Sequence, residues 1–222
     1  MTQEISKSKV EAQFPFEFNI LKEYGQLVNG WENAYNHCKT ECAAALVISD
    51  LINLDSEKRN ILAKAAILHD WYKRKEKESG IEGSDKYEKG VIDSYEGLLK
   101  LGVDKQIVDI AHNVGHTSLL DIQVTTDILK KIMHFIDDIT FESDIVELDV
   151  RIDANEANEQ YKELNESGRA KHNGRTYFEV QREVGHKIQD EIEKTIIDVK
   201  SNVELKKGEL VYIIKNNIGK YL

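Results

Sequence analysis

Several features that mark particular classes of protein are scarce in this sequence. Only one of its 222 residues is proline and only two are cysteine, which argues against a proline-rich linker and a disulfide framework. The longest apolar run, Cys42–Ile48, is too short to cross a bilayer, and no signal-peptide segment follows Met1. The net charge of −10 argues against a nucleic-acid polymer as the main partner. These absences predict a cytoplasmic protein without a membrane segment.

Helical periodicity extends over most of the chain, whose length suits one domain or one domain with an added lobe. The predicted helices are Phe14–Asn29, Trp31–Asn53, a helix from Asp55 or Ser56 to His69-Asp70, Tyr87–Leu101, a short helix capped by Asp104 with Gly115 as its C′ residue, Thr125–Thr140, Asp144–Glu166 closed by Gly168, and a helix from the capping box Thr176–Glu179 to about Lys200. Ser201–Glu204 is a further capping box, and Val211–Lys215 is compatible with a short strand. No other strand pattern is visible, so the predicted fold class is all-α.

The stretch Ala63–Lys73 is the most informative part of the sequence. It reads as the end of an apolar helix that presents His69 and Asp70 side by side. Such groups must be solvated or ligated, and an imidazole next to a carboxylate can reach one metal ion. The alternative is an ordinary helix end, where His69 interacts favourably with the helix dipole and Asp70 starts a loop.

Other candidate ligands lie at helix positions that also carry core residues. They are His37, His112 or His116, and Asp137 or Asp138. A helical domain can bring ligands from distant sequence positions to one point. Nitrogen and oxygen donors of this kind suit Zn²⁺, Mn²⁺, Fe²⁺ or Co²⁺ better than a soft metal.

The order of these residues resembles the HD superfamily of metal-dependent phosphohydrolases. His69–Lys73 (HDWYK) resembles the His-Asp-x-x-Lys element of that family, and FIDD is similar to the segment with its final aspartate. By register, that aspartate is Asp137 rather than Asp138. The match covers about 31–147 and implies an HD helical bundle there. Residues 1–30 would form an N-terminal helical extension, and the helices of 148–222 would pack on the core.

The resemblance also implies roles for individual residues. His37, His69, Asp70 and Asp137 would hold a divalent metal ion, whose identity (Mn, Co, Mg, Zn or Fe) stays open. Lys73 would bind the substrate phosphate, the alternative being a surface lysine in a charged loop. In members with two metals, further histidines bind the second ion. The predicted helix Tyr87–Leu101 contains no histidine, so we expect one metal, with His112 and His116 lining the substrate pocket.

Glu41 departs from the family pattern, which usually has an aliphatic residue one turn after the first histidine. It is either a helix-surface glutamate, paired for example with a lysine, or a residue that reaches the site, where it positions water or replaces a ligand. Asp70, Lys73 and Glu41 are therefore the catalytic candidates. His134 is either a partner of the metal ligands or a core histidine.

The activity implied by the resemblance is hydrolysis of a phosphate ester of a nucleotide or another small phosphorylated metabolite. Two alternatives stay open: a di-iron oxygenase with the same fold, which requires more histidines, and a non-catalytic nucleotide-binding regulatory domain. The C-terminal third contains a group of basic residues that either form a solvated surface or close over the pocket to bind phosphate. They are Arg151, Arg169, Lys171, Arg175 and Arg182. The long helices are also compatible with a homodimer.

Overall fold

The structure is built almost entirely from helices, which confirms the all-α prediction. The computed structural model describes residues 8–24, 32–73, 75, 85–200 and 205–222. The helices are α1 Lys9–Gln13, α2 Pro15–Glu23, α3 Glu32–Leu51, α4 Ser56–Leu68, α6 Asp85–Lys100, α7 Lys105–Ala111, α8 Gly115–Val124, α9 Ile128–Ile139, α10 Leu148–Glu156, α11 Lys162–Lys171, α12 Tyr177–Val199 and α13 Leu210–Asn217, with 3₁₀ turns at Glu159–Tyr161 and Ile218–Lys220. In the described part, the strands β1 (Thr140–Phe141) and β2 (Asp144–Ile145) form one antiparallel hairpin.

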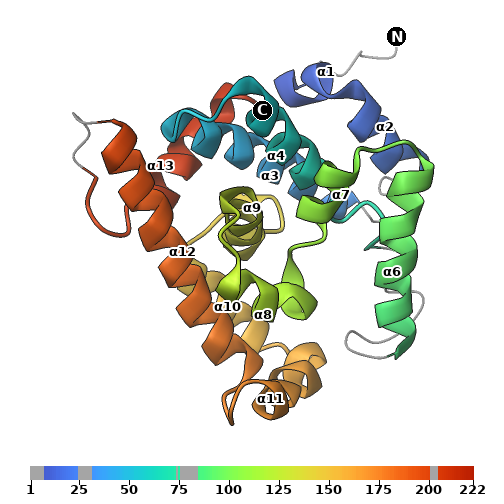
Figure 1. The fold of residues 1–222 in the computed structure, drawn as a ribbon, viewed down its shortest axis with the longest axis vertical. Coiled ribbons are helices and arrows are strands. Elements are labelled where there is room, and N and C mark those ends of the chain that lie inside the picture. Colours follow the sequence, from blue (N-terminus) through green and yellow to red (C-terminus); the bar gives the residue numbers. More distant parts are fainter. Residues whose placement is uncertain (1–7, 25–31, 74, 76–84, 201–204) are drawn as a thin grey trace.

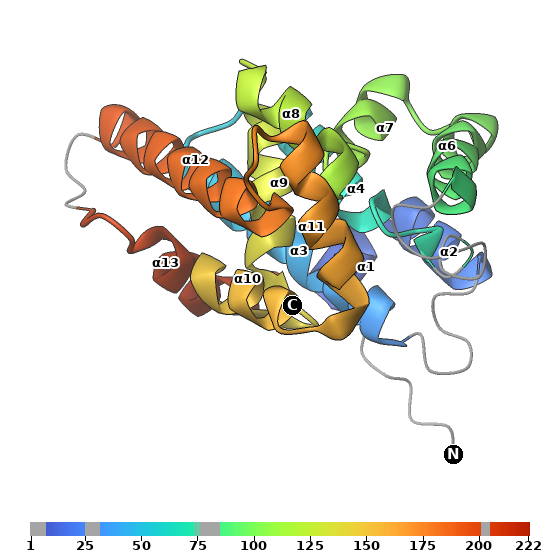
Figure 2. The same ribbon diagram turned by 90° about the horizontal axis from the view of Figure 1, so that it is seen from below.

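Helix α9 lies at the centre of the molecule, where Figure 1 shows it nearly end-on. Its apolar side chains recur at helical spacing, and Ile132, Phe135 and Ile139 are all fully buried. Helices α12 and α6 lie on opposite sides of α9 in Figures 1 and 2. Buried side chains from the N-terminal, central and C-terminal parts of the chain form one cluster, which includes Phe18 and Ile188. This core fixes the helices that carry the candidate ligands.

Side-chain caps set the starts of several helices where the sequence predicts them. The Asp55 carboxylate accepts a hydrogen bond from the backbone N–H of Lys58, so α4 begins at Ser56. Thr176 and Glu179 form the predicted capping box at the start of α12. Because α4 is helical only to Leu68, the His69-Asp70 pair lies at its C-terminal end.

The predicted single helix Asp144–Glu166 is wrong. Its first residues belong to the hairpin, and the rest is divided between α10 and α11. The break lies at Asn158, whose side chain accepts a hydrogen bond from the backbone N–H of Gln160 and so starts a new turn. Gly168 does not close a helix but lies within α11. A Cβ atom there would lie 2.3 Å from the backbone nitrogen of Tyr177, so the glycine permits close packing.

Other boundaries also differ from the sequence predictions. Val211–Lys215 is helical rather than extended, because it lies in α13. Gly115 does not end a helix but begins α8. The predicted helix Phe14–Asn29 corresponds to α2, which begins at Pro15, and a separate short helix, α1, precedes it and ends at Gln13. Residues 25–29 and the predicted capping box at 201–204 lie outside the described residues. Among the described helices, none has both the length and the apolar character to cross a membrane.

Candidate metal centre

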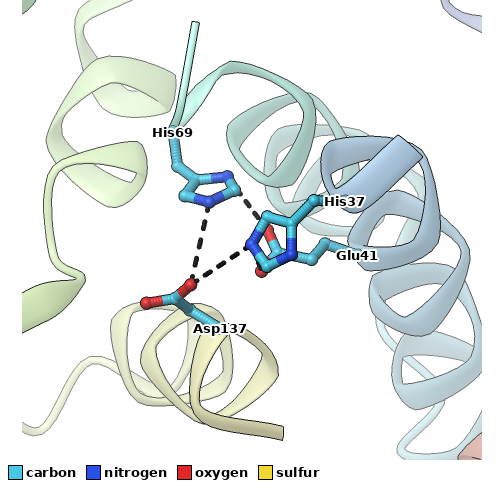
Figure 3. Close-up of side chains that lie close together, drawn as sticks. All are labelled: His37, Glu41, His69 and Asp137. Carbon is cyan, nitrogen blue, oxygen red and sulfur yellow. Dashed lines mark ion pairs between the residues drawn. The ribbon is translucent and has the colours of Figure 1, made fainter. Parts of the chain in front are cut away.

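Three helices bring four side chains that could bind a metal ion together near the centre of the fold. His37 and Glu41 lie one turn apart on α3, His69 follows the last residue of α4, and Asp137 lies in the last turn of α9. If each residue offers one ligand atom, the four atoms all lie within 4.8 Å of one another. Figure 3 shows the four side chains converging. We call these four residues the metal cluster.

The individual distances show how closely the donor atoms approach. Nε2 of His37 lies 2.9 Å from Oε1 of Glu41 and 3.4 Å from Oδ1 of Asp137. The same Asp137 oxygen is 3.9 Å from Nε2 of His69 (Figure 3). Glu41 Oε2 is 2.9 Å from the other ring nitrogen of His69, Nδ1. Asp137 Oδ1 therefore faces the Nε2 atoms of both histidines.

Backbone carbonyl groups orient both histidine rings. Nδ1 of His37 lies 2.9 Å from the carbonyl oxygen of Glu142 in the hairpin, and Nδ1 of His69 lies 2.9 Å from that of Ala66. Because a carbonyl oxygen can only accept, each Nδ1 must carry the proton. In a neutral ring this leaves the Nε2 lone pair for a metal ion. The Thr40 hydroxyl donates to the carbonyl oxygen of Ser143, at 3.0 Å, which ties the hairpin to α3.

The surroundings of Glu41 fit a divalent cation. This side chain is 0% exposed, and in the described part of the chain its oxygens face only the rings of His37 and His69, each at 2.9 Å, without the geometry of a good hydrogen bond. Nε2 of His69 is also buried without one. Burial of an ionised carboxylate without hydrogen bonds costs several kcal/mol unless a cation compensates it. Two imidazoles and two carboxylates are also a donor set that suits Zn²⁺, Mn²⁺ or Fe²⁺.

The electrostatics of the metal cluster also favour positive charge. Burial is the largest influence and would lower the pKa of His37 and of His69, but the carboxylates around them together outweigh it and raise both well above their usual value: Glu41 and Asp137 for His37, Glu41 and Asp70 for His69. Burial would raise the pKa of Asp137, but its hydrogen bond with His37 and the nearby charge of His69 lower it below its usual range. Protons therefore occupy this cluster readily, and metal binding would displace them.

One edge of the metal cluster faces solvent. The side chains of Asp70, Asp137 and Lys73 are 17%, 23% and 27% exposed. Asp70 Oδ2 lies 3.8 Å from Nε2 of His69, and Oδ1 lies 3.4 Å from Nζ of Lys73. Burial would raise the pKa of Asp70, but the charges of Lys73 and His69 lower it. Asp70 thus borders the four converging residues.

Three of the four expected ligands lie within this group of four residues, whereas Asp70 lies beside it. Glu41 does not lie on the helix surface, and the interpretation as a surface glutamate is wrong. The signal that indicates its position is the spacing from His37, because residues four apart share one helix face. Asp138, the alternative to Asp137, faces away: Gln181 Nε2 donates to its Oδ1 at 2.5 Å.

His112, predicted to line the substrate pocket, is close enough to the metal cluster for the charge of His69 to act on it. Burial and the charge of His69 lower the pKa of His112 to about 4, so its ring is neutral at neutral pH. The ring packs edge-on against Tyr95, and the buried Nε2 has no hydrogen-bond partner among the described residues. The side chain of His116 lies outside the described part of the structure.

Comparison with family models, curated proteins and solved structures finds no match to this chain.

Proposed function

We propose that this chain is a metal-dependent phosphohydrolase of the HD type. The observation that supports this function best is the buried metal cluster with one solvent-facing edge, where Asp70 and Lys73 lie. His37, His69 and Asp137 would hold the ion, with Glu41 as a fourth donor. The proposed substrate is a phosphate ester of a nucleotide or another small phosphorylated metabolite.

A divalent metal ion at this position would make a water molecule more acidic and polarise a phosphoryl oxygen. Asp70 is placed to assist, because it stays ionised at neutral pH and lies at the solvent-facing edge. Its Oδ2, which faces His69, would accept a proton from the attacking water. Lys73 would bind the substrate phosphate, and its contact with Asp70 fixes the ammonium beside the reacting groups.

His112 would contribute to substrate binding as a neutral imidazole. Its pKa of about 4 keeps it uncharged throughout the neutral range. A buried ring nitrogen without a partner gains a hydrogen bond when a polar group of the substrate reaches it. This gain favours substrate groups that can donate to or accept from an imidazole.

Elemental analysis of the purified protein tests the metal, and a phosphate-release screen with added Mn²⁺, Co²⁺ or Mg²⁺ tests the activity. We expect one metal per chain and release from a particular nucleotide or sugar phosphate. Asp70→Ala should lower release by at least about 100-fold while the circular dichroism spectrum stays helical. The control is Asp121→Ala, which removes an exposed carboxylate on α8.

Wild-type turnover by the Asp70→Ala protein would refute the mechanism. Two irons per chain without phosphate release would favour the di-iron oxygenase. Nucleotide binding without metal or turnover would favour the regulatory domain.

A further inference from the structure

The hairpin that follows α9 contains a backbone conformation that its residue rarely adopts. The strands pair Phe141 with Asp144, so Glu142 and Ser143 form a two-residue turn between them. Glu142 has a φ of 55°, in the left-handed region that disfavours residues with a Cβ atom. Hairpin turns that need a positive φ at the first turn residue usually have glycine there. The glutamate side chain is exposed, so its own packing does not explain this conformation.

Two hydrogen bonds with α3 hold the turn in place. The carbonyl oxygen of Glu142 lies 2.9 Å from Nδ1 of His37, and the carbonyl oxygen of Ser143 accepts from the hydroxyl group of Thr40 at 3.0 Å. His37 and Thr40 are three residues apart and therefore share one face of the helix. In an extended strand, consecutive carbonyl groups point in opposite directions. Both carbonyl groups can reach the same helix because the chain turns at Glu142.

The other end of the hairpin is attached to a second candidate ligand. Strand β1 begins at Thr140, directly after α9, and the backbone N–H of Thr140 donates to the carbonyl oxygen of Asp137. The backbone N–H of Val146, just after β2, donates to the carbonyl oxygen of Ile139 at 2.9 Å. The hairpin is therefore a hydrogen-bonded link between two members of the metal cluster, Asp137 on α9 and His37 on α3.

We propose that Glu142 is a positioning residue of the metal centre, and that its left-handed backbone conformation fixes the ring of His37 for metal binding. This inference rests on the metal centre of the proposed function. Nε2 of His37 faces Asp137 Oδ1, at 3.4 Å, because the opposite side of the ring is bonded to the Glu142 carbonyl group. A shift of that carbonyl group would let the ring turn away from the other donors. Partners that orient a metal-binding histidine typically contribute about 10- to 100-fold to metal affinity.

Substitutions that change what the backbone tolerates test this role on the full-length chain. Glu142→Gly fits the left-handed conformation, whereas Glu142→Val disfavours it, because a β-branched residue rarely adopts a positive φ. Both variants lose the same charge, so the difference between them reports the backbone alone. The matched control is Asn173→Val, since Asn173 has a φ of 56° in an exposed turn after α11, outside the hairpin.

Metal affinity and ring orientation separate positioning from general stability. In a calorimetric Zn²⁺ titration, Glu142→Val should bind about 10- to 100-fold more weakly than wild type, and Glu142→Gly and Asn173→Val should stay within about threefold. In the metal-free protein, NMR should show the Nδ1 proton of His37 protected from exchange with water in wild type, Glu142→Gly and Asn173→Val. This protection should be lost in Glu142→Val. Urea unfolding should show both valine variants destabilised by similar amounts.

Four results would overturn the proposal: Glu142→Val binds Zn²⁺ as tightly as wild type, Glu142→Gly weakens binding as much as Glu142→Val, Asn173→Val weakens it equally, or wild type binds no metal. Failure of the proposed phosphohydrolase activity has a different signature. In that case wild type binds the metal and hydrolyses no phosphate ester, while the metal affinity still depends on the residue at position 142.

Discussion

Asp137 and Asp138 are consecutive residues of α9, yet they belong to two buried polar clusters with very different surroundings. Asp137 belongs to the metal cluster (Figure 3). Asp138 lies between His134, one turn earlier, and Gln181 of α12. We call His134, Asp138 and Gln181 the α9–α12 cluster. Each cluster thus contains at least one histidine and one carboxylate.

The two clusters differ in how many donors converge and in their access to solvent. The metal cluster draws four donors from three helices, and Asp137 is partly exposed. The α9–α12 cluster has one imidazole, one carboxylate and one amide, all buried. Asp138 Oδ2 and His134 Nε2 are 3.5 Å apart and neither has a hydrogen-bond partner in the described part of the chain. Among the described residues, convergence of four donors and an open edge therefore distinguish the candidate metal site from the α9–α12 cluster.

The electrostatic consequences are opposite for the two neighbours. Despite burial, His37 and His69 lower the pKa of Asp137. Burial raises the pKa of Asp138 to about 6, because the opposing effects of His134 and Gln181 are too small to offset it. Asp137 is therefore ionised at neutral pH, as a metal ligand must be, whereas Asp138 is partly protonated just below neutrality.

The largest expected difference between the two clusters concerns metal affinity. Asp137→Asn removes a charged ligand and should weaken Mn²⁺ or Zn²⁺ binding by more than about 100-fold, the upper range for residues that only orient a ligand. Asp138→Asn replaces a carboxylate outside the metal cluster with an amide of similar shape. It should leave the metal affinity within a few-fold of wild type. Calorimetric metal titration measures both. Equal losses of metal affinity in the two variants would contradict the distinction between the two clusters.

The next effect is a pH dependence of stability that belongs to Asp138. Its pKa is 3.8 when unperturbed and about 6 in the folded state, a difference that corresponds to about 3 kcal/mol. Because the folded pKa is the higher one, this stabilisation is present below pH 3.8 and is lost as pH rises through 6. Urea unfolding with a chelator should show wild type losing about 2 kcal/mol of this relative to Asp138→Asn between pH 4 and 7, because part of the difference is already lost at pH 4. Parallel curves would contradict the assignment.

A substitution of Glu41, the fully buried member of the metal cluster, tests whether this carboxylate contributes to metal binding. Glu41→Gln keeps the shape but removes the negative charge between the histidines, so metal affinity should fall by about 10- to 100-fold. The control is Glu32→Gln, an exposed residue in the first turn of the same helix. Unchanged affinity in Glu41→Gln would restrict the ligands to the other three residues and leave Glu41 a purely structural role.

Sequence reasoning predicts the histidines of the metal cluster because each lies beside an apolar stripe. His37 lies at the edge of the helix face that carries Cys38 and Cys42, both of which are fully buried. Glu41 lies on the same helix and is equally buried, but sequence alone cannot distinguish a buried carboxylate from a surface one. Glu41 contacts His37 one turn earlier on α3, which the spacing indicates, and His69 at the end of α4, which no local pattern indicates.

Sequence periodicity also fails to predict helix boundaries where the helical pattern continues across the end of a helix. The helical pattern extends past Asn158, although its side chain starts a new turn there. The backbone N–H groups of Gly208 and Leu210 bind the buried carboxylate of Glu193 in α12, near the start of α13. The contacts with Glu193 join residues 15 and 17 positions apart, so no local pattern records them.

The smallest expected effect concerns Gln181, which joins α12 to α9. Its amide Nε2 donates to Asp138 at 2.5 Å, and its Oε1 is buried without a partner in the described structure. Gln181→Met removes this hydrogen bond but also removes an unsatisfied oxygen, so the net loss of unfolding free energy should be about 1 kcal/mol. Metal affinity should be unchanged, because no atom of Gln181 belongs to the metal cluster. Thermal unfolding and metal titration of this variant measure the two quantities separately. A loss of metal affinity as large as that of Asp137→Asn would mean that the α9–α12 cluster positions Asp137, and that the two clusters act as one unit.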